Sequence, residues 1–291
     1  MKLIVQSIII CIILSTGPAF SKTIKIAVIQ DKHTEGSTYL LLQDYLKSKN
    51  IDAMLYSYGS YLLAAKNFEK GVVDIMFTGS GIAGWMIIKN IAYPVVRPVA
   101  KEGWSTYSAV IIAPAGSSHF TGELSALKGK RIAACELASS GEFFVRSLLG
   151  DESDLVITES HSDALEKLKS GVVDIAVIKN RVWDVLKKKY PGFEQISGDK
   201  AEHPNGTLMA SYNADKNIIK KLKTLLLGFE NDRSPQAMRI KTAMNIKGFI
   251  LTQEKDFEQT LALLKKAGIS ERSEFVFHED LQSSSKKKNN E

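Results

Sequence analysis

One pentapeptide constrains this chain more than any other feature. Gly-Val-Val-Asp-Ile at positions 71–75 recurs letter for letter at 171–175, each time after an amphipathic stretch. Upstream, Lys-Ile-Ala-Val at 25–28 pairs with Arg-Ile-Ala-Ala at 131–134, and each is followed by a polar loop and a helical pattern. Two copies are too few for a solenoid, but they predict two similar α/β lobes. An alternative stays open, in which Gly-x-x-Asp merely ends a helix and starts a strand twice.

The order of elements is that of a βα fold. Short β-branched runs alternate with amphipathic stretches, and Leu40, Leu41 and Tyr45 share one face of the first predicted helix. Parallel strands joined by crossover helices follow from that order. The predicted elements of the first copy are strands at 23–29, 51–57 and 72–77, and helices at 36–49, at 60–70 and from 79–81 onward.

The chain is predicted to pass between the lobes twice. Extended segments at 95–100 and 107–112 carry it across, and 203–206 returns it. Three helical patterns would then complete the first lobe, at 215–229, 235–244 and 253–267. The predicted divisions are a first lobe of 22–104 plus 208–282, a second lobe of 105–207, and a disordered polar tail at 283–291.

The N-terminus has the pattern of a secretory signal peptide. Lys2 precedes an almost unbroken apolar run at 3–14, and 19–21 reads Ala-Phe-Ser, a small-x-small cleavage site. An uncleaved anchor is one alternative, but about 12 apolar residues fall short of the roughly 20 that a spanning helix needs. A lipoprotein is another, although Ile10 before Cys11 is bulky where a lipidation motif has a small residue. We expect cleavage after residue 21 and export to the periplasm.

The composition excludes several classes of protein and argues against one class of partner. Cleavage would leave Cys135 alone, so the exported chain forms no internal disulfide and depends on a packed core. The formal net charge is +6, but the 38 Lys and Arg residues are scattered along the sequence, which argues against nucleic acid as a partner. With 20 Gly and 7 Pro in 291 residues, collagen-like and disordered classes are excluded.

Two predicted helix starts suit an oxyanion. Ser139, Ser140 and Gly141 open a helix after a strand, and Ser80 occupies the equivalent place in the other copy. A helix N-terminus presents unpaired N–H groups and the positive end of the dipole. A plain serine N-cap is an equal alternative. His161 also stands where a strand meets a helix and could hydrogen-bond an anion in the same cleft, although a lone histidine is more often a surface or capping residue.

The sequence contains no familiar catalytic set. There is no Gly-x-Ser-x-Gly, His-Glu-x-x-His, P-loop or Cys-x-x-Cys pattern. Cys135 follows an apolar strand and is interpreted as a small buried hydrophobe. The five histidines lack metal-ligand spacing. We therefore predict that the protein is not an enzyme and needs no metal or other cofactor.

Taken in order, these features resemble the periplasmic phosphonate-binding, PhnD-like family of substrate-binding proteins of ABC transporters. The resemblance covers roughly residues 24–230. Its landmarks include Tyr61 before Asp74, Tyr107 in the extended segment, Leu-Lys-Gly-Lys-Arg at 127–131, the Ser-Ser-Gly turn at 139–141, and His161. It implies a type II periplasmic binding protein, an α/β fold whose two lobes are joined by a two-segment hinge and close on a ligand.

The resemblance also implies binding residues. In relatives of this kind the Ser-Gly turn, two tyrosines and the histidine contact the phosphonate oxygens. Carried over, this implicates Ser139, Ser140, Gly141, Tyr61, Tyr107 and His161. Ser80 is added from the repeat, and Arg181 from its position after the second repeated strand.

Three departures from the family bear on the ligand. Relatives that bind aminoalkyl phosphonates tend to have an acidic residue after the second repeated strand, whereas this chain has Lys-Asn-Arg at 179–181. The stretch 205–207, Asn-Gly-Thr, also lacks a carboxylate, and Ala138 replaces a frequent serine. We therefore expect phosphate, phosphite or a simple phosphonate to bind in preference to 2-aminoethylphosphonate.

The resemblance implies an ABC permease in the inner membrane as the partner of a monomeric binding protein. An alternative is a ligand-binding module that a sensor kinase or another periplasmic receptor reads. A transferase or hydrolase on the same fold is a third reading, for which no nucleophile, base or metal site can be named.

Overall fold

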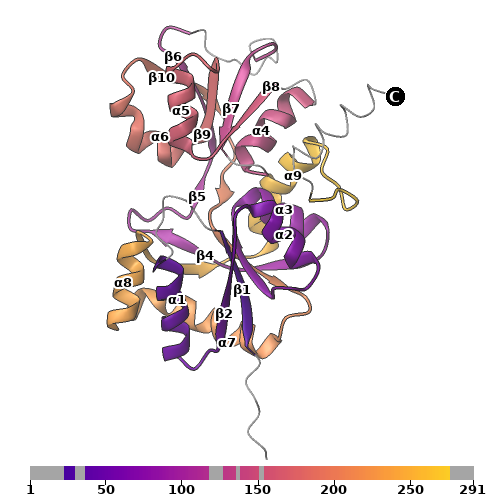
Figure 1. Ribbon diagram of the computed structural model, residues 1–291, viewed down its shortest axis with the longest axis vertical. Helices are drawn as coiled ribbons and strands as arrows, with labels where there is room; N and C mark the ends of the chain where they lie inside the picture. Colours follow the sequence, from indigo (N-terminus) through magenta and orange to yellow (C-terminus); the bar gives the residue numbers. More distant parts are fainter. Residues whose placement is uncertain (1–22, 30–36, 118–126, 136–137, 151–153, 276–291) are drawn as a thin grey trace, which may run out of the picture.

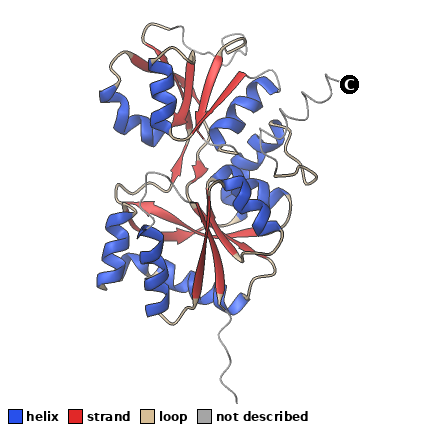
Figure 2. Cartoon of the chain, in the orientation of Figure 1, coloured by secondary structure: helices blue, strands red, loops and turns tan. Residues whose placement is uncertain are grey.

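The computed structural model describes residues 23–29, 37–117, 127–135, 138–150 and 154–275 (Figure 1). The predicted signal peptide at 1–21 and the predicted tail at 283–291 lie outside these ranges. In the described ranges the strands form one sheet of six, one of five and one short pair. Helices flank the two larger sheets, which lie one above the other in Figure 2. Two α/β lobes are therefore confirmed.

The first sheet has the order β13-β4-β12-β3-β1-β2. Its strands are β1 (Ile24–Ile29), β2 (Ala53–Tyr58), β3 (Ile75–Thr78), β4 (Ala92–Ala100), β12 (Thr207–Ser211) and β13 (Ile246–Leu251). The helices of this half are α1 (Ser37–Ser48), α2 (Tyr61–Glu69), α3 (Ser80–Ile88), α7 (Lys216–Leu227), α8 (Pro235–Ala243) and α9 (Glu258–Lys266), with short 3-10 turns at Phe229–Asn231 and Glu254–Phe257.

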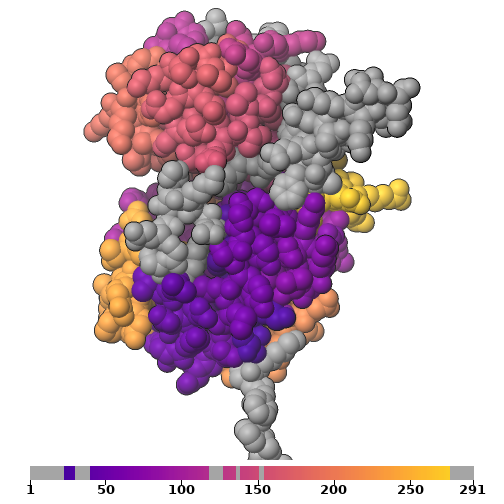
Figure 3. All heavy atoms as spheres, viewed as in Figure 1, coloured from indigo at the N-terminus to yellow at the C-terminus, as the bar shows by residue number. Residues whose placement is uncertain are grey.

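The second sheet has the order β10-β6-β9-β7-β8. Its strands are β6 (Ala109–Pro114), β7 (Arg131–Cys135), β8 (Asp154–Thr158), β9 (Ile175–Lys179) and β10 (Phe193–Gly198). Its helices are α4 (Ser140–Leu149), α5 (His161–Lys169) and α6 (Asn180–Leu186), with a 3-10 turn at Lys187–Lys189. Figure 3 shows this half as the pink mass above the indigo and gold first half.

The repeated pentapeptide makes the same backbone contacts in both halves. Asp74 accepts a hydrogen bond from the Lys25 backbone N–H at 2.8 Å, and Asp174 accepts one from Arg131 N–H at 2.8 Å. Each aspartate therefore ties the start of one parallel strand to its neighbour. Gly71 and Gly171 have φ of 71° and 72°, a left-handed conformation that favours glycine at the end of a helix. The motif does end a helix and start a strand twice, and it does so at equivalent places of two similar sheets.

The sheets are only partly parallel, which corrects the prediction. β2-β1-β3 and β8-β7-β9 are parallel, as the βα order implies. In contrast, β12 lies antiparallel to β3, and β6 lies antiparallel to β9. Each of these strands enters its sheet from the other lobe, so its direction is set by the crossing and not by a local βα unit. The edge strand β13 is not predicted by the sequence pattern at all.

The two crossings run side by side. One leaves β4 and reaches β6 through β5 (Thr106–Tyr107), and the other leaves β10 and reaches β12 through β11 (His203–Pro204). β5 and β11 pair antiparallel, with Tyr107 opposite His203. Thr207, the last residue of the predicted second lobe, is the first residue of β12 in the first sheet. This short pair is the connection between the lobes visible in Figure 1.

Both faces of each large sheet are covered. In the first half, α1, α7 and α8 pack on one face and α2, α3 and α9 on the other. In the second half, α5 and α6 cover one face and α4 the other. The central strands are consequently apolar on both faces, as parallel strands usually are. None of the helices in the described ranges has the length and apolarity required to cross a membrane.

The lobes touch where α3 and α4 begin. A Cβ added to Gly81 would lie 2.2 Å from the Ala138 carbonyl oxygen, so only glycine permits this approach. Beside it, the rings of Trp85 and Phe143 meet edge to face with centroids 6.0 Å apart. α9, expected to belong to the first lobe alone, contacts both α3 and α4. The N-termini of two helices from different lobes therefore lie next to each other.

Candidate ligand-binding site

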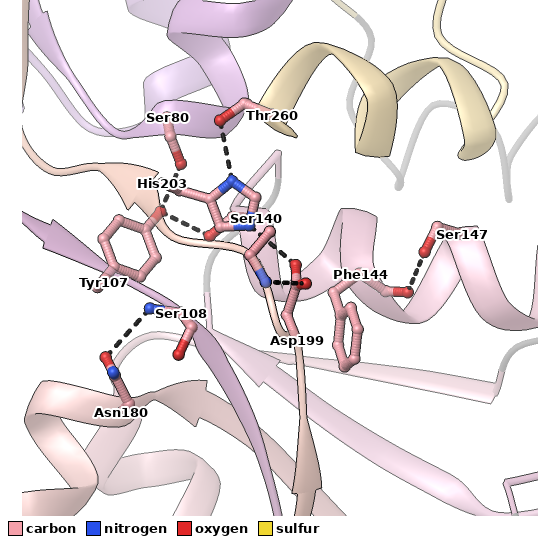
Figure 4. Close-up of polar contacts among 11 residues, drawn as sticks. Ser80, Tyr107, Ser108, Ser140, Phe144, Ser147, Asn180, Asp199, His203 and Thr260 are labelled. Carbon is pink, nitrogen blue, oxygen red and sulfur yellow. Dashed lines mark hydrogen bonds and ion pairs between the residues drawn. The ribbon is translucent and has the colours of Figure 1, made fainter. Parts of the chain in front are cut away.

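A chain of three buried hydroxyl groups joins the lobes. Tyr107 Oη lies 2.7 Å from Ser80 Oγ and 2.5 Å from Ser140 Oγ (Figure 4). Ser80 begins α3 in the first lobe, Tyr107 lies in the crossing strand β5, and Ser140 begins α4 in the second lobe. All three side chains are buried. The helix starts at equivalent places of the repeat, those of α3 and α4, are therefore joined through one tyrosine hydroxyl.

The start of α4 combines a cap with free donors. Ser139 is the N-cap, and its Oγ accepts a hydrogen bond from Glu142 N–H at 3.1 Å. Ser139 therefore caps α4, and it also lines the pocket described below. The N–H groups of the next residues, Ser140 and Gly141, have no partner carbonyl within the helix, because first-turn N–H groups never do. They stand at the positive end of the helix dipole.

His161, the first residue of α5, presents an unsatisfied nitrogen. The residue as a whole is half-buried, but its Nδ1 is buried and has no hydrogen-bond partner among the described residues. Burial, assisted by the nearby charge of Lys179, lowers the pKa of His161 from its ordinary value of 6.5 to about 3. The imidazole is therefore neutral at neutral pH and can offer either a lone pair or a single N–H at this atom.

Lys179 is a candidate binding residue that the sequence pattern did not single out. It is the last residue of β9, and its Nζ lies 3.3 Å from Asn205 Oδ1 and 4.4 Å from the centroid of the Tyr107 ring. One signal could have found it: residues at the carboxyl ends of neighbouring parallel strands meet at the same edge of a sheet. Lys179 ends β9 at the edge where Cys135 ends the parallel strand β7.

These groups line one small pocket between β5, the start of α4, the start of α5 and the end of β9. Its volume is about 10 Å³, room for roughly one water molecule. Its lining residues are Tyr107, Ala109, Cys135, Ser139, Ser140, Gly141, His161, Val177, Ile178 and Lys179. Its polar side chains can all donate hydrogen bonds, although the hydroxyls can also accept them, and no lining residue is acidic. A polyatomic anion would match them, provided that the hydroxyl chain opens to admit it.

The sequence of residues 27–257 matches the family model described as the periplasmic substrate-binding protein of phosphonate ABC transporters. The chain belongs to this family. Because the match spans most of the chain, the resemblance found in the sequence is confirmed.

Solved structures support the family's fold. PhnD1 from Prochlorococcus marinus, in complex with methylphosphonate, has a TM-score of 0.67 at 17% identity, covering 85% of this chain and 99% of that one. A binding protein component of an ABC phosphonate transporter from Pseudomonas aeruginosa has a TM-score of 0.65 at 13% identity, covering 92% and 94%. XAC2383 from Xanthomonas citri, bound to ATP, has a TM-score of 0.69 at 15% identity, covering 85% and 98%. No curated protein matches the chain.

As a member of this family, the protein is a periplasmic substrate-binding component that works with an ABC permease. The type II periplasmic binding protein fold is likewise confirmed. A substrate-binding protein of this fold holds its ligand between the lobes. The small pocket lies on the second lobe beside the crossing strand β5, and Ser80 of the first lobe is hydrogen-bonded to Tyr107 in its lining.

Two residues that the sequence suggested for the site, Tyr61 from the family resemblance and Arg181 from its position after a repeated strand, lie away from this pocket. Tyr61 begins α2 and packs against the apolar cluster between that helix and the first sheet. Arg181 Nη2 lies 3.3 Å from Glu202 Oε1, and its Cζ lies 5.9 Å from the centroid of the Trp104 ring. Neither side chain lines the pocket, so the structure gathers Ser80, Ser139, Ser140, Gly141, Tyr107 and His161 but not Tyr61 or Arg181.

A second buried network supports the crossing strands beside the pocket (Figure 4). The fully buried ring of His203 lies 2.9 Å from Thr260 Oγ1 through Nδ1 and 2.9 Å from Asp199 Oδ2 through Nε2. Burial alone would raise the pKa of Asp199, but the hydrogen bonds from His203 and Ala201 N–H outweigh it and lower that pKa. This network connects the end of β10, the crossing strand β11 and α9.

Proposed function

We propose that this protein captures a small phosphorus oxyanion, namely phosphate, phosphite or a simple phosphonate, in the pocket beside the junction of its lobes and delivers it to an ABC permease. The observation that carries the proposal is the convergence of the α4 N-terminus, the partnerless Nδ1 of His161 and the ammonium of Lys179 on one pocket without a carboxylate. Donors converging on one point suit an oxyanion better than a sugar or an amine, which also need acceptors.

Binding requires the hydroxyl chain between the lobes to open. The ligand's oxygen atoms would replace the contacts that Tyr107 now makes with Ser80 and Ser140. Because these three residues come from both lobes and the crossing, one bound anion would hold both lobes together. We propose that the protein acts as a monomer, without covalent chemistry and without a cofactor.

We also propose that the N-terminal segment is a cleaved signal peptide. Cleavage after residue 21 would release the chain into the periplasm, where the family functions. Mass spectrometry of the protein recovered from the periplasm tests this directly. A mature N-terminus at Lys22 is expected, whereas an intact Met1 or a lipid on Cys11 would contradict it.

Thermal unfolding tests the ligand class. The chain from residue 22 onward is dialysed free of ligand and melted with phosphate, phosphite, methylphosphonate, 2-aminoethylphosphonate, sulfate and a pyrimidine. A ligand at about 1,000 times its dissociation constant adds roughly 4 kcal/mol of stability. At roughly 2 °C per kcal/mol, the midpoint should rise by about 8 °C with a phosphorus oxyanion.

A matched pair of serine variants locates the binding. Ser140→Ala removes a hydroxyl from the pocket, whereas Ser147→Ala removes one from the same helix that donates only to the Phe144 carbonyl, at 2.7 Å. The ligand-induced rise should shrink in the first variant and persist in the second. If no phosphorus compound raises the midpoint of the unmodified protein, the proposed function is wrong. If 2-aminoethylphosphonate binds most tightly, the ligand class is wrong.

A further inference from the structure

Lys179 carries a positive charge that the described protein leaves uncompensated. No carboxylate of the described residues lies within 4.0 Å of its Nζ. Its partners are the neutral amide oxygen of Asn205 and the face of the Tyr107 ring. Two residues along the chain, in contrast, Arg181 is paired with Glu202.

The position of Lys179 suits its ammonium to an anion in the pocket. The side chain is half-buried, and it lines the pocket together with Ser140 and His161. A partly desolvated ammonium without a counter-ion is costly, so an anion in the pocket would gain more there than at the surface. Asn205 and Tyr107 fix the ammonium in place without neutralising it.

We propose that Lys179 is the counter-ion of the bound ligand and that it selects a doubly charged oxyanion over one carrying an ammonium group. This inference rests on the proposed function and deepens it. The phosphoryl group would receive a charge-assisted hydrogen bond from Lys179 Nζ in addition to the donors of α4. An ammonium on the ligand would instead face Lys179 across a pocket that offers no acidic side chain.

Two substitutions test the charge. Lys179→Met removes it, and Asn205→Asp adds a carboxylate at the atom that now lies 3.3 Å from Lys179 Nζ, with almost no change in shape. Lys187→Met is the control, because that lysine is half exposed and paired with Asp184 at 3.0 Å on the surface of the same lobe. Titration calorimetry measures the affinities for methylphosphonate at pH 8.5, where the dianion dominates, and for 2-aminoethylphosphonate.

We expect Lys179→Met to weaken methylphosphonate binding by about tenfold to a hundredfold, the range for a lost hydrogen bond to a charged group. Asn205→Asp should weaken it as well and shift the ratio of affinities toward 2-aminoethylphosphonate. Lys187→Met should bind as the unmodified protein does.

The outcomes separate this inference from the proposed function. If Lys179→Met and Asn205→Asp melt normally without ligand and still bind methylphosphonate within twofold of the unmodified protein, the role of Lys179 is refuted and the proposed function stands. If Lys179→Met fails to fold, an unchanged affinity ratio in Asn205→Asp refutes it in the same way. If the unmodified protein binds neither compound nor phosphate, the proposed function itself is refuted.

Discussion

The hydroxyl of Tyr107 lies 2.5 Å from the hydroxyl of Ser140, so a residue of the crossing strand is bonded directly to the first turn of a helix in the second lobe. The same tyrosine hydroxyl is bonded to Ser80 in the first lobe. This contact fills the space where donors from both lobes converge. If the ligand binds as proposed, it displaces the tyrosine hydroxyl that joins the lobes, which would link binding to movement about the two crossings.

Removing this hydroxyl should weaken both the resting contact and the binding of ligand. Tyr107→Phe leaves Ser80 and Ser140 buried with one partner fewer, which should cost about 1 kcal/mol of stability without ligand. If Tyr107 also contacts the anion, methylphosphonate affinity should fall by about tenfold. Calorimetric melting and titration measure the two effects. An unchanged affinity would place the ligand away from Tyr107.

The close approach at Gly81 should control how far the lobes close. Gly81→Ala places a methyl group 2.2 Å from the Ala138 carbonyl oxygen, a distance that backbone atoms must relieve by moving apart. We expect a larger radius of gyration by X-ray scattering and weaker ligand binding. Gly59→Ala is the control, because nothing lies within 4 Å of its added Cβ. Identical scattering from Gly81→Ala and the unmodified protein would show that the lobes do not meet here in solution.

The fold was largely predictable because its signals are local. In both copies the glycine ends a helix and the aspartate accepts a hydrogen bond from the neighbouring strand. The repeat therefore predicts two similar sheets. β12 and β13 were harder, since their neighbours in the sheet are distant in sequence and their direction depends on the crossings. The hydrophobic periodicity that identifies strands and helices does not show which strands pair or in which direction they run.

The serines of the candidate site were predictable because they begin a helix. The cation of the candidate site was not, because its role depends on which charges pair. Ser139 and Ser140 follow from the strand-to-helix pattern, and the structure places both at the pocket. The sequence pattern suggested Arg181, but nothing in the sequence shows that Glu202 lies beside Arg181 and pairs with it. Which of two nearby cations keeps an unpaired charge is decided by tertiary contacts alone.

His161 should make the ligand-free protein less stable in acid. Its pKa is lowered to about 3 in the folded chain, whereas an unfolded histidine titrates near 6.5. Between these values the unfolded state binds the proton and the folded state does not, so stability falls as the pH drops from 6.5 toward 3. His161→Gln should lose less stability over that interval, as measured by denaturant unfolding at several pH values. Parallel pH curves for the two proteins would contradict the neutral, buried imidazole.

Ligand binding should reverse the shift at the same histidine. An anion beside Nδ1 favours the protonated ring, so methylphosphonate should raise the pKa of His161. Nuclear magnetic resonance titration of the histidine ring protons, with and without ligand, checks the direction. A pKa that stays at its ligand-free value under saturating ligand would mean that His161 does not face the anion.

The hydrogen bond between His203 of the crossing strand β11 and Thr260 of α9 should stabilise the protein. Thr260→Val keeps the shape of the side chain but removes the oxygen 2.9 Å from His203 Nδ1, which should cost about 1 kcal/mol. Thr224→Val on the exposed side of α7 should change the unfolding free energy by less than about 0.5 kcal/mol. Equal stabilities of the two variants would show that the Thr260 contact contributes nothing measurable.

A crystal structure of the mature protein grown with methylphosphonate tests the central claim most directly. We predict the phosphoryl group between the lobes, with oxygen atoms within hydrogen-bonding distance of Ser140 Oγ, His161 Nδ1 and Lys179 Nζ, and with the contact between Tyr107 and Ser140 opened. A phosphonate bound outside this pocket, or a pocket still closed by the hydroxyl chain under saturating ligand, would contradict the account.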